Sequence, residues 1–417
     1  MAYNHFILTV RELSKWLSMK LLLLCLTVTG LALAQTRAPS LLWVRSQAEW
    51  GSKHSAPGSR VEAMVVQDYV SPTGFVVPIG SRVNGKVVAA SARKNASLRM
   101  EFDSVAVAGR EFALQAHISA VDNAREVVTA DGTILALDRL RKRPGKVELI
   151  LLAAAYAHPA VLASVEGGKY VVREVRPPEV AYPVGTDYAL ALEVPPTGSS
   201  NARVEMPEPQ VAEGIAELLA TLPNRTTTTR GAAPADWINI AFVGSKERVE
   251  RAFQVAGWIA ARQLSIRADM KTFLAVAASH SYQEAPVSAL WWSNRAPDLV
   301  YQKQTNTFAK RHHIRIWQAG VDPQGEVVWL AACTHDVGIE FSRATRSFMH
   351  RIDSNIDNER LKVLGDLRVA GQVSSWAYVS RPAVPAQSKN ATGDAVNTDG
   401  RLAVVQLGAP PSPTNSR

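Results

Sequence analysis

The side chains best suited to chemistry stand where an apolar run ends, at the adjacent pair His335 and Asp336. The run over residues 326–331 is typical of a buried strand. A strand that ends in an imidazole and a carboxylate has two interpretations. The carboxylate can orient the imidazole as a general base or a metal ligand in a site. Alternatively, the pair only caps the strand end.

The segment before this run predicts a tight hairpin. Residues 321–326 read VDPQGE, which places Asp, Pro and Gly as in a type I turn with a G1 bulge. If the ladder continues from this turn without interruption, His313 lies opposite His335 and Arg315 lies on the same face. These side chains would then share one rim of the sheet.

A later segment adds ionisable side chains just before a predicted helix. Residues 349–360 read MHRIDSNIDNER and contribute His350, Arg351 and Asp353. Asp353 or Ser354 is the predicted N-cap of that helix. If this segment folds over the hairpin rim, its side chains join those of His313 and His335.

Two site chemistries remain open for these residues. Imidazole and guanidinium groups bind phosphate or carboxylate, so the ligand-binding candidates are His313, Arg315, His335 and Arg351. Imidazoles also hold a divalent metal such as zinc, so the metal-ligand candidates are His313, His335 and His350. The catalytic candidates are His335, Asp336, His350 and Asp353. Caps and ion pairs at a sheet edge are the structural alternative, because no short zinc signature, phosphate loop or nucleophile motif accompanies these residues.

Composition indicates a folded chain with diffuse positive charge. The 417 residues are 47% hydrophobic and 20% charged, which favours two packed domains over disorder. The formal net charge of +9 favours anionic partners such as a lipid surface or a phosphate ligand. Because no nucleic-acid-binding signature is present, we expect no nucleic-acid partner.

The N-terminus predicts export. A basic residue, Lys20, precedes an apolar stretch of about a dozen residues and an Ala-Leu-Ala cleavage motif that ends at Ala34. We therefore expect residues 1–34 to be a signal peptide, with Met19 as a candidate true start. An uncleaved anchor is the alternative. The stretch is short for a membrane span, so we expect no transmembrane span in the mature chain and a periplasmic or envelope-associated protein. Cleavage would leave Cys333 as the only cysteine, without an internal disulfide.

The rest of the chain divides by composition. Residues 41–196 predict an all-β barrel or sandwich, with short strands at 61–67, 83–90, 98–102, 112–118, 133–137 and 185–195. Residues 197–235 read as a linker, with a short helix over 209–222. Residues 236–371 predict an α+β domain around the antiparallel hairpin, with strands at 238–243, 299–302, 313–318 and 326–334 and helices after Ser245 and at 270–278 and 356–367. Residues 382–417 read as a disordered tail. The expected fold class is therefore multi-domain.

Several motifs of the second domain resemble a known family. INIAFVGSKERVERAFQVAGW, PVSALWW, RHHIRIW, VWLAACTHDVGIEF and HRIDSNIDNERLKVLGDL occur in the order of the LssY C-terminal domain family. That resemblance implies a bacterial envelope protein, without implying an activity. VPIGSRVNGKVV, SLRMEFDSVAVAGREFAL and YPVGTDYALALEVP are similar to the barrel of TrbI/VirB-type type IV secretion channel subunits, over residues 61–195.

Two functions are consistent with these features. The first is an exported, membrane-associated cell-envelope module that works by binding and assembly, with envelope proteins as partners and an anionic ligand at the His/Arg/Asp rim. The alternative is a metal-dependent or His/Asp hydrolase of phosphorylated or lipid-derived envelope substrates.

Overall fold

The computed structural model describes residues 40–92, 96–136, 179–228, 233–261, 290–303, 305–306, 310–342 and 347–408. The expected signal peptide at 1–34 and the predicted helix at 270–278 lie outside these ranges. From Leu41 onward the chain forms one compact unit, which is mostly β-sheet. Among the residues described, no helix has both the length and the apolar character needed to cross a membrane.

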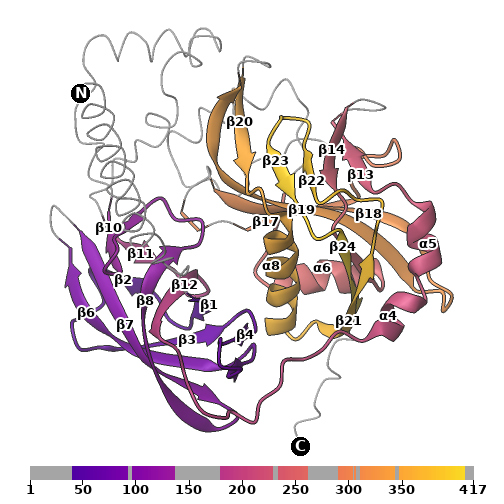
Figure 1. The fold of residues 1–417 in the computed structure, drawn as a ribbon. Helices are drawn as coiled ribbons and strands as arrows, with labels where there is room; N and C mark the ends of the chain where they lie inside the picture. The colour runs from indigo at the N-terminus through magenta and orange to yellow at the C-terminus, as the bar shows by residue number, and fades with distance from the viewer. Residues whose placement is uncertain are drawn as a thin grey trace, which may run out of the picture. The chain divides into compact units, whose positions relative to one another are not determined.

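The N-terminal half is built around an eight-stranded sheet in the order β6-β3-β1-β12-β8-β7-β10-β9, in which β6 also pairs with β7 (Figure 1). Its strands are β1 (Ser40–Ser46), β3 (Arg60–Val65), β6 (Arg82–Ser91), β7 (Ser97–Val107), β8 (Arg110–Val121), β9 (Val127–Val128), β10 (Thr133–Leu135) and β12 (Asp187–Val194). Two small pairs accompany it, β2 (Trp50–Gly51) with β11 (Ala181–Tyr182) and β4 (Tyr69–Val70) with β5 (Val76–Val77). The predicted strands of this half are confirmed, since each expected run overlaps one of these strands.

Alternation explains the N-terminal sheet. Along β7 buried and partly exposed residues alternate, as expected for strands with one face on a core. The inner face packs Leu98, Met100 and Phe102 with Trp50 into one apolar cluster. Gly85 permits the close approach of β6 and β7, because a Cβ at this position would lie 2.2 Å from the carbonyl oxygen of Glu101.

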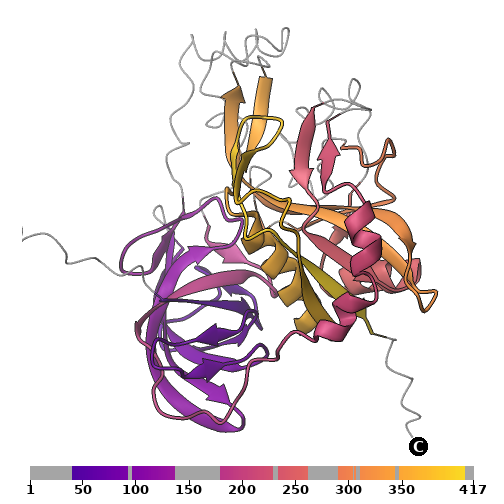
Figure 2. The ribbon, with the colours of Figure 1, turned by 45° about the vertical axis from the view of Figure 1, so that its right-hand side comes forward.

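The C-terminal half holds a second sheet in the order β16-β17-β18-β19-β15-β24-β21, with β20 paired to β19 (Figure 1). Its strands are β15 (Ile240–Val243), β16 (Ile259–Ala260), β17 (Leu299–Lys303), β18 (Arg311–Val321), β19 (Val327–Ser342), β20 (Ser347–Ile352), β21 (Val373–Ser380) and β24 (Arg401–Leu407). The far half of β19 and β20 extend beyond the rest of this sheet (Figure 2). Two further pairs are β13 (Arg225–Thr227) with β14 (Pro234–Trp237) and β22 (Gln387–Lys389) with β23 (Ala395–Asn397).

Helices cover both faces of the C-terminal sheet. On one face α6 (Lys246–Val255) and α8 (Ile356–Val369) share an apolar cluster with Ile314, Ile316 and Cys333. On the other face α5 (Ala216–Thr221), which follows α4 (Pro209–Glu213), packs with Trp317 and Leu330. This half therefore combines a mostly antiparallel sheet with helices.

The helix boundaries follow capping chemistry. The Ser245 hydroxyl accepts from the backbone N–H of Arg248 at 3.4 Å and starts α6, as expected from the sequence. Gly371, at φ 65°, follows the end of α8 in the left-handed region. The predicted N-cap of α8 was wrong by one or two residues. Asn355, not Asp353 or Ser354, caps the helix, because its side chain accepts from the backbone N–H of Asp357.

The disordered tail expected at 382–417 was also wrong in its first part. Residues 387–389 and 395–397 form the β22–β23 hairpin, and β24 runs parallel to β15 inside the sheet. Residues 401–407 join the sheet because their sequence, RLAVVQL, is apolar. Val404 and Val405 are fully buried on opposite faces of the sheet. The segment before this run, residues 382–400, forms turns and the short β22–β23 hairpin. The segment interpreted as a linker likewise contributes Ile215 and Leu219 to the core.

The hairpin turn has the predicted conformation, but the register of its two strands differs from the prediction. Gly325, at φ 82°, donates to the Asp322 carbonyl at 3.0 Å, and Asp322 donates to the Glu326 carbonyl at 2.9 Å. A β-bulge between Gln318 and Gly320 then shifts the ladder by one residue. Consequently His335 lies opposite His312. The prediction that His335 faces His313 is corrected, because one extra residue moves every later side chain to the other face.

Candidate functional site

A row of three basic side chains ends the face of the C-terminal sheet that α6 and α8 cover. Lys303 at the end of β17 pairs with His312 on β18, which pairs with His335 on β19. The neighbouring row on the same face, Tyr301, Ile314 and Cys333, belongs to the apolar core. The sheet therefore changes from core to polar site within one alternation step.

His312 lies between two carboxylates. Its Nδ1 is 2.6 Å from Glu359 Oε2 on α8, and its Nε2 is 2.8 Å from Asp122 Oδ2, just after β8. Burial alone would lower the pKa of His312, but the charges and hydrogen bonds of Asp122 and Glu359 outweigh it and raise the pKa to about 10. The same attraction outweighs the burial of the Asp122 carboxyl and lowers its pKa far below the usual range.

His335 stacks against His312 and has a different environment. The two ring centroids are 4.3 Å apart with an interplanar angle of 26°. His335 Nε2 is 2.8 Å from Asn123 Oδ1. Burial, followed by the charge of His312, lowers the pKa of His335. The pKa values of the two neighbouring imidazoles are thus shifted in opposite directions. His335 stays neutral near pH 7.

An ion-pair network continues from Lys303. Three cations share two buried carboxylates: the cations are Arg45, Lys303 and Lys362, and the carboxylates are Asp187 and Asp366. Arg45 binds Asp187 through Nε at 2.7 Å and Nη2 at 2.9 Å. Burial lowers the pKa of Lys303 to about 8 despite the attraction of Asp366. A third carboxylate, Asp122, also attracts Lys362.

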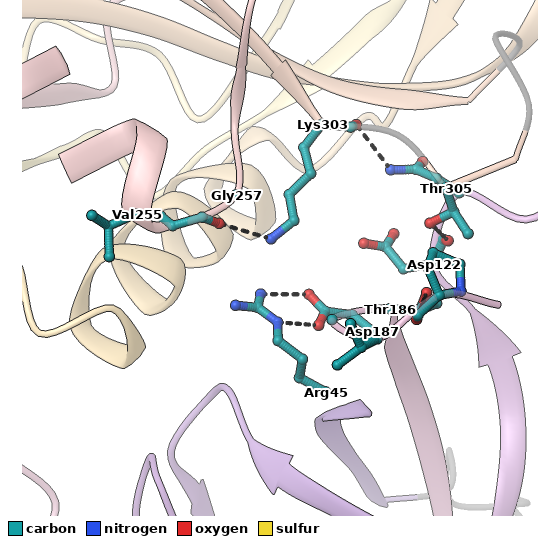
Figure 3. A pocket seen from close by; sticks show the side chains of 13 residues that line it. Arg45, Asp122, Thr186, Asp187, Val255, Gly257, Lys303 and Thr305 are labelled. Carbon is teal, nitrogen blue, oxygen red and sulfur yellow. Dashed lines mark hydrogen bonds and ion pairs between the residues drawn. The ribbon is translucent and has the colours of Figure 1, made fainter. Parts of the chain in front are cut away.

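A cavity of about 330 Å³ opens beside this network. Arg45, Asp122, Asn123, Asp187 and Lys303 contribute polar groups to its lining. Figure 3 shows the Lys303 amine, the Arg45 guanidinium and the Asp122 carboxylate on different sides of this cavity. Another part of the wall is formed by Val255, Ala256 and Gly257, at the end of α6. Such a cavity could hold a small polar ligand between opposite charges.

The predicted rim residues do not gather at this cavity. His313, Arg315 and Asp336 lie on the opposite face of the sheet, where all three are buried. His313 Nε2 is 2.7 Å from the hydroxyl of Thr334 and 3.4 Å from Asp336 Oδ1. Arg315 Nη1 is 3.5 Å from Asp236 Oδ2. The structure thus separates His335 from its expected partners His313 and Arg315.

The candidates from the later segment take separate positions. His350 pairs with Ile339 in the backbone of β20, and its side chain lies outside the part of the structure that is described. The side chain of Arg351 is exposed. Asp353 accepts hydrogen bonds from the backbone of Asn355 at 3.0 Å and from the Asn358 amide at 3.3 Å, as a turn residue does.

Most residues of this site were not identified from the sequence. The residues that were missed are Arg45, Asp122, Asn123, Asp187, Lys303, His312 and Glu359. The predicted register placed His313 opposite His335, and the adjacent histidines at 312 and 313 gave no means of choosing between them without the bulge. Asp122 and Glu359 lie 190 and 47 residues from His312, so no local spacing could have paired them.

Comparison with known families covers only the C-terminal part. Residues 219–402 match the model described as LssY C-terminus. The match includes Lys303, His312, His335 and Glu359, but it ends far from Arg45 and Asp122. A search of curated proteins found no match. The match is wider than the predicted domain at 236–371, and it includes the last three residues of α5 and the first two of β24.

Proposed function

We propose that this chain, an LssY C-terminus domain joined to a β-rich N-terminal region, is an exported envelope protein that binds a small anionic ligand. The observation that carries the proposal is that two cations, Arg45 and Lys303, line the cavity. An anion bound there would be attracted by both of them.

The cations keep donors for such a ligand. Arg45 uses Nε and Nη2 on Asp187 and Asp366, while its Nη1 makes no hydrogen bond to any residue the structure describes. The Lys303 amine donates to the Ala256 carbonyl at 3.3 Å and to Asp366 at 2.9 Å, which leaves one of its three N–H groups. Both residues line the cavity. Two donors from opposite walls can therefore meet one phosphate or carboxylate group.

The size of the cavity supports a small ligand or a headgroup. A volume of about 330 Å³ lies at the lower end of the range for ligand pockets, which is roughly 300–1,000 Å³. A phosphate group with a short substituent would fit, whereas a whole lipid would have to leave its chains outside. This size favours a phosphorylated small molecule or an anionic headgroup.

The envelope location rests on the N-terminal sequence. A basic residue, an apolar stretch and an Ala-Leu-Ala motif that ends at Ala34 support export. The N-terminal sheet is proposed to be a barrel, because β6 pairs with both β3 and β7. This barrel would dock on envelope partners while the cavity holds the ligand.

A hydrolase is the second candidate, and one specific observation favours it. Asp122, which lines the cavity, lies close to the imidazoles of His312 and His335. Such a group could activate water if it holds a metal ion. Hydrolysis by this group needs a metal ion bound at these residues.

Isothermal titration of inorganic phosphate into the purified protein at pH 7 tests the binding function. We expect saturable binding with one site per chain, and a loss of about tenfold or more for Lys303→Gln, since a hydrogen bond to a charged group contributes about 1.5–3 kcal/mol. Lys246→Gln removes the same charge from an exposed position on α6 and should bind as the wild type does. Equal loss in both variants, or no binding by the wild type, would reject the cavity as a phosphate site.

A further inference from the structure

Two imidazoles converge with the carboxylate of Asp122, a residue that lines the cavity. Each of Asp122, His312 and His335 offers one ligand atom, and the three atoms lie within 4.8 Å of one another. We propose that these three residues form a binding site for one divalent first-row metal ion, with Zn²⁺ as the reference ion. This inference goes beyond anion binding and does not depend on it.

The donor set matches this ion. Zinc in catalytic sites takes three protein ligands from His and Asp or Glu and leaves a further position open, whereas structural zinc sites use four. The same pair of His residues with one carboxylate also suits other first-row ions. Imidazole ligands disfavour Mg²⁺ and Ca²⁺, which prefer oxygen ligands.

The spacing of the first two ligands is already close to that of a coordinated pair. His312 Nε2 and Asp122 Oδ2 are 2.8 Å apart. Two ligands bound tetrahedrally to one zinc ion at ~2.1 Å lie about 3.4 Å apart. An ion that replaces the proton between these atoms therefore requires them to separate by about 0.6 Å.

Glu359 supplies the support that such a ligand needs. Its Oε2 is 2.6 Å from His312 Nδ1, and both side chains are buried. A metal-bound histidine usually donates its second N–H to a carboxylate, which fixes the tautomer and the ring orientation. Glu359 on α8 and His312 on β18 form this arrangement with Nε2 directed at Asp122. Hence the same imidazole connects a second carboxylate to the proposed ion.

His335 is the proposed third ligand, and the cavity gives the proposed ion an open side. His335 stacks on His312 and contacts Asn123 Oδ1 at 2.8 Å, so Asn123 can orient His335 or add a further oxygen. Asp122 and Asn123 also line the cavity of about 330 Å³. A water molecule or an anion in this cavity could therefore occupy the open position of the ion. The site thus has a buried supporting side and an accessible side.

Calorimetric titration of Zn²⁺ tests the site on the full chain, purified without a polyhistidine tag and stripped of metal with a chelator. All titrations are made in phosphate-free buffer, so that loss of anion binding cannot affect the result. We expect one tight Zn²⁺ per chain and a loss of at least 100-fold in affinity for Asp122→Asn and His335→Gln. Glu359→Gln should lose roughly 10–100-fold, as other supporting carboxylates do.

His117→Gln is the matched control. His117 lies on β8, near Asp122, and its Nδ1 is 3.0 Å from Glu193, but it does not belong to the three-ligand group. This variant should keep wild-type affinity for Zn²⁺. If His117→Gln loses as much affinity as His335→Gln, the binding is non-specific and the proposal fails.

A spectroscopic measurement on wild-type protein avoids any dependence on variants that fold poorly. X-ray absorption of the zinc-loaded chain should give two imidazole ligands with additional oxygen ligands. An all-oxygen shell, or no stoichiometric zinc after loading, would overturn the proposal. Phosphate binding with unchanged affinity in zinc-free protein would leave the anion site standing even if the metal site fails.

Discussion

His312 and His335 lie directly opposite each other on β18 and β19, with ring centroids 4.3 Å apart. This relationship exists because of the bulge between Gln318 and Gly320. In a regular ladder from the same turn, His313 would take the place of His312. One extra residue in a strand thus decides which histidine joins the site and which enters the opposite face.

The register makes a direct prediction about His313. Because His313 contacts Thr334 and Asp336 on the other face, His313→Gln should leave Zn²⁺ and phosphate affinity within about twofold of the wild type. His312→Gln should abolish tight Zn²⁺ binding. Titrations of the two variants side by side check this, and the reverse pattern would mean that His313 is the site residue.

The pKa of Lys303 predicts how anion affinity depends on pH. Burial lowers this pKa to about 8, so the amine loses its charge as pH rises through 8. Sulfate is a suitable probe because it stays a dianion throughout this range. We expect sulfate affinity to be highest at pH 6–7 and to fall toward pH 9.5, with a midpoint near 8. Lys303→Gln should remove that dependence, and an unchanged slope in this variant would assign it to another group.

Gly365→Ala is expected to lower the free energy of unfolding, although a Gly→Ala change in a helix usually raises it. In an exposed helix Gly→Ala stabilises by about 1 kcal/mol. In α8, however, a Cβ at Gly365 would lie 2.6 Å from the carbonyl oxygen of Val66, which is backbone and cannot rotate away. Gly365→Ala should therefore destabilise the protein by roughly 1–3 kcal/mol.

Thermal and urea unfolding measure the effect of Gly365→Ala. Gly214→Ala is the control, because the nearest atom to its added Cβ would be the flexible Gln324 side chain at 3.6 Å. A stabilised Gly365→Ala variant would show that α8 does not approach Val66 this closely.

Cys333 should be inert in the folded protein. Its side chain is fully buried, its thiol donates to Asn239 Oδ1 at 3.1 Å, and burial raises its pKa well above the usual value. In a Cys25→Ser chain, where Cys333 is the only cysteine, a thiol reagent at pH 8 should react roughly 100-fold more slowly before unfolding than in guanidinium. Equal rates would contradict the placement of β19 in the core.

Local signals explain which parts of the fold could be predicted. The VDPQGE turn, the Ser245 cap and the apolar alternation of the strands each depend on neighbours within a few residues. β24 was missed although its RLAVVQL run is apolar, because the surrounding Pro, Ser and Asn residues suggested a tail. Its parallel pairing with β15 joins residues about 160 apart, which composition does not indicate.

The site depended on features that a single sequence hides. A bulge needs no particular residue at its centre, so the one-residue shift after Gln318 had no signature. Asp122 and Arg45 come from strands far away in the chain and reach the site only through the packing of the folded unit. His335 alone was identified from the sequence, because a polar residue at the end of an apolar strand is visible in the local pattern.

Anomalous diffraction at the zinc edge, from crystals of the zinc-loaded full chain, tests the central claim most directly. The arrangement of Asp122, His312 and His335 predicts one strong peak bonded to both imidazoles and the carboxylate, with an open side toward the cavity. A map with no peak between these residues, and with His312 still hydrogen-bonded to Asp122, would contradict the account and leave the cluster as a structural ion-pair network.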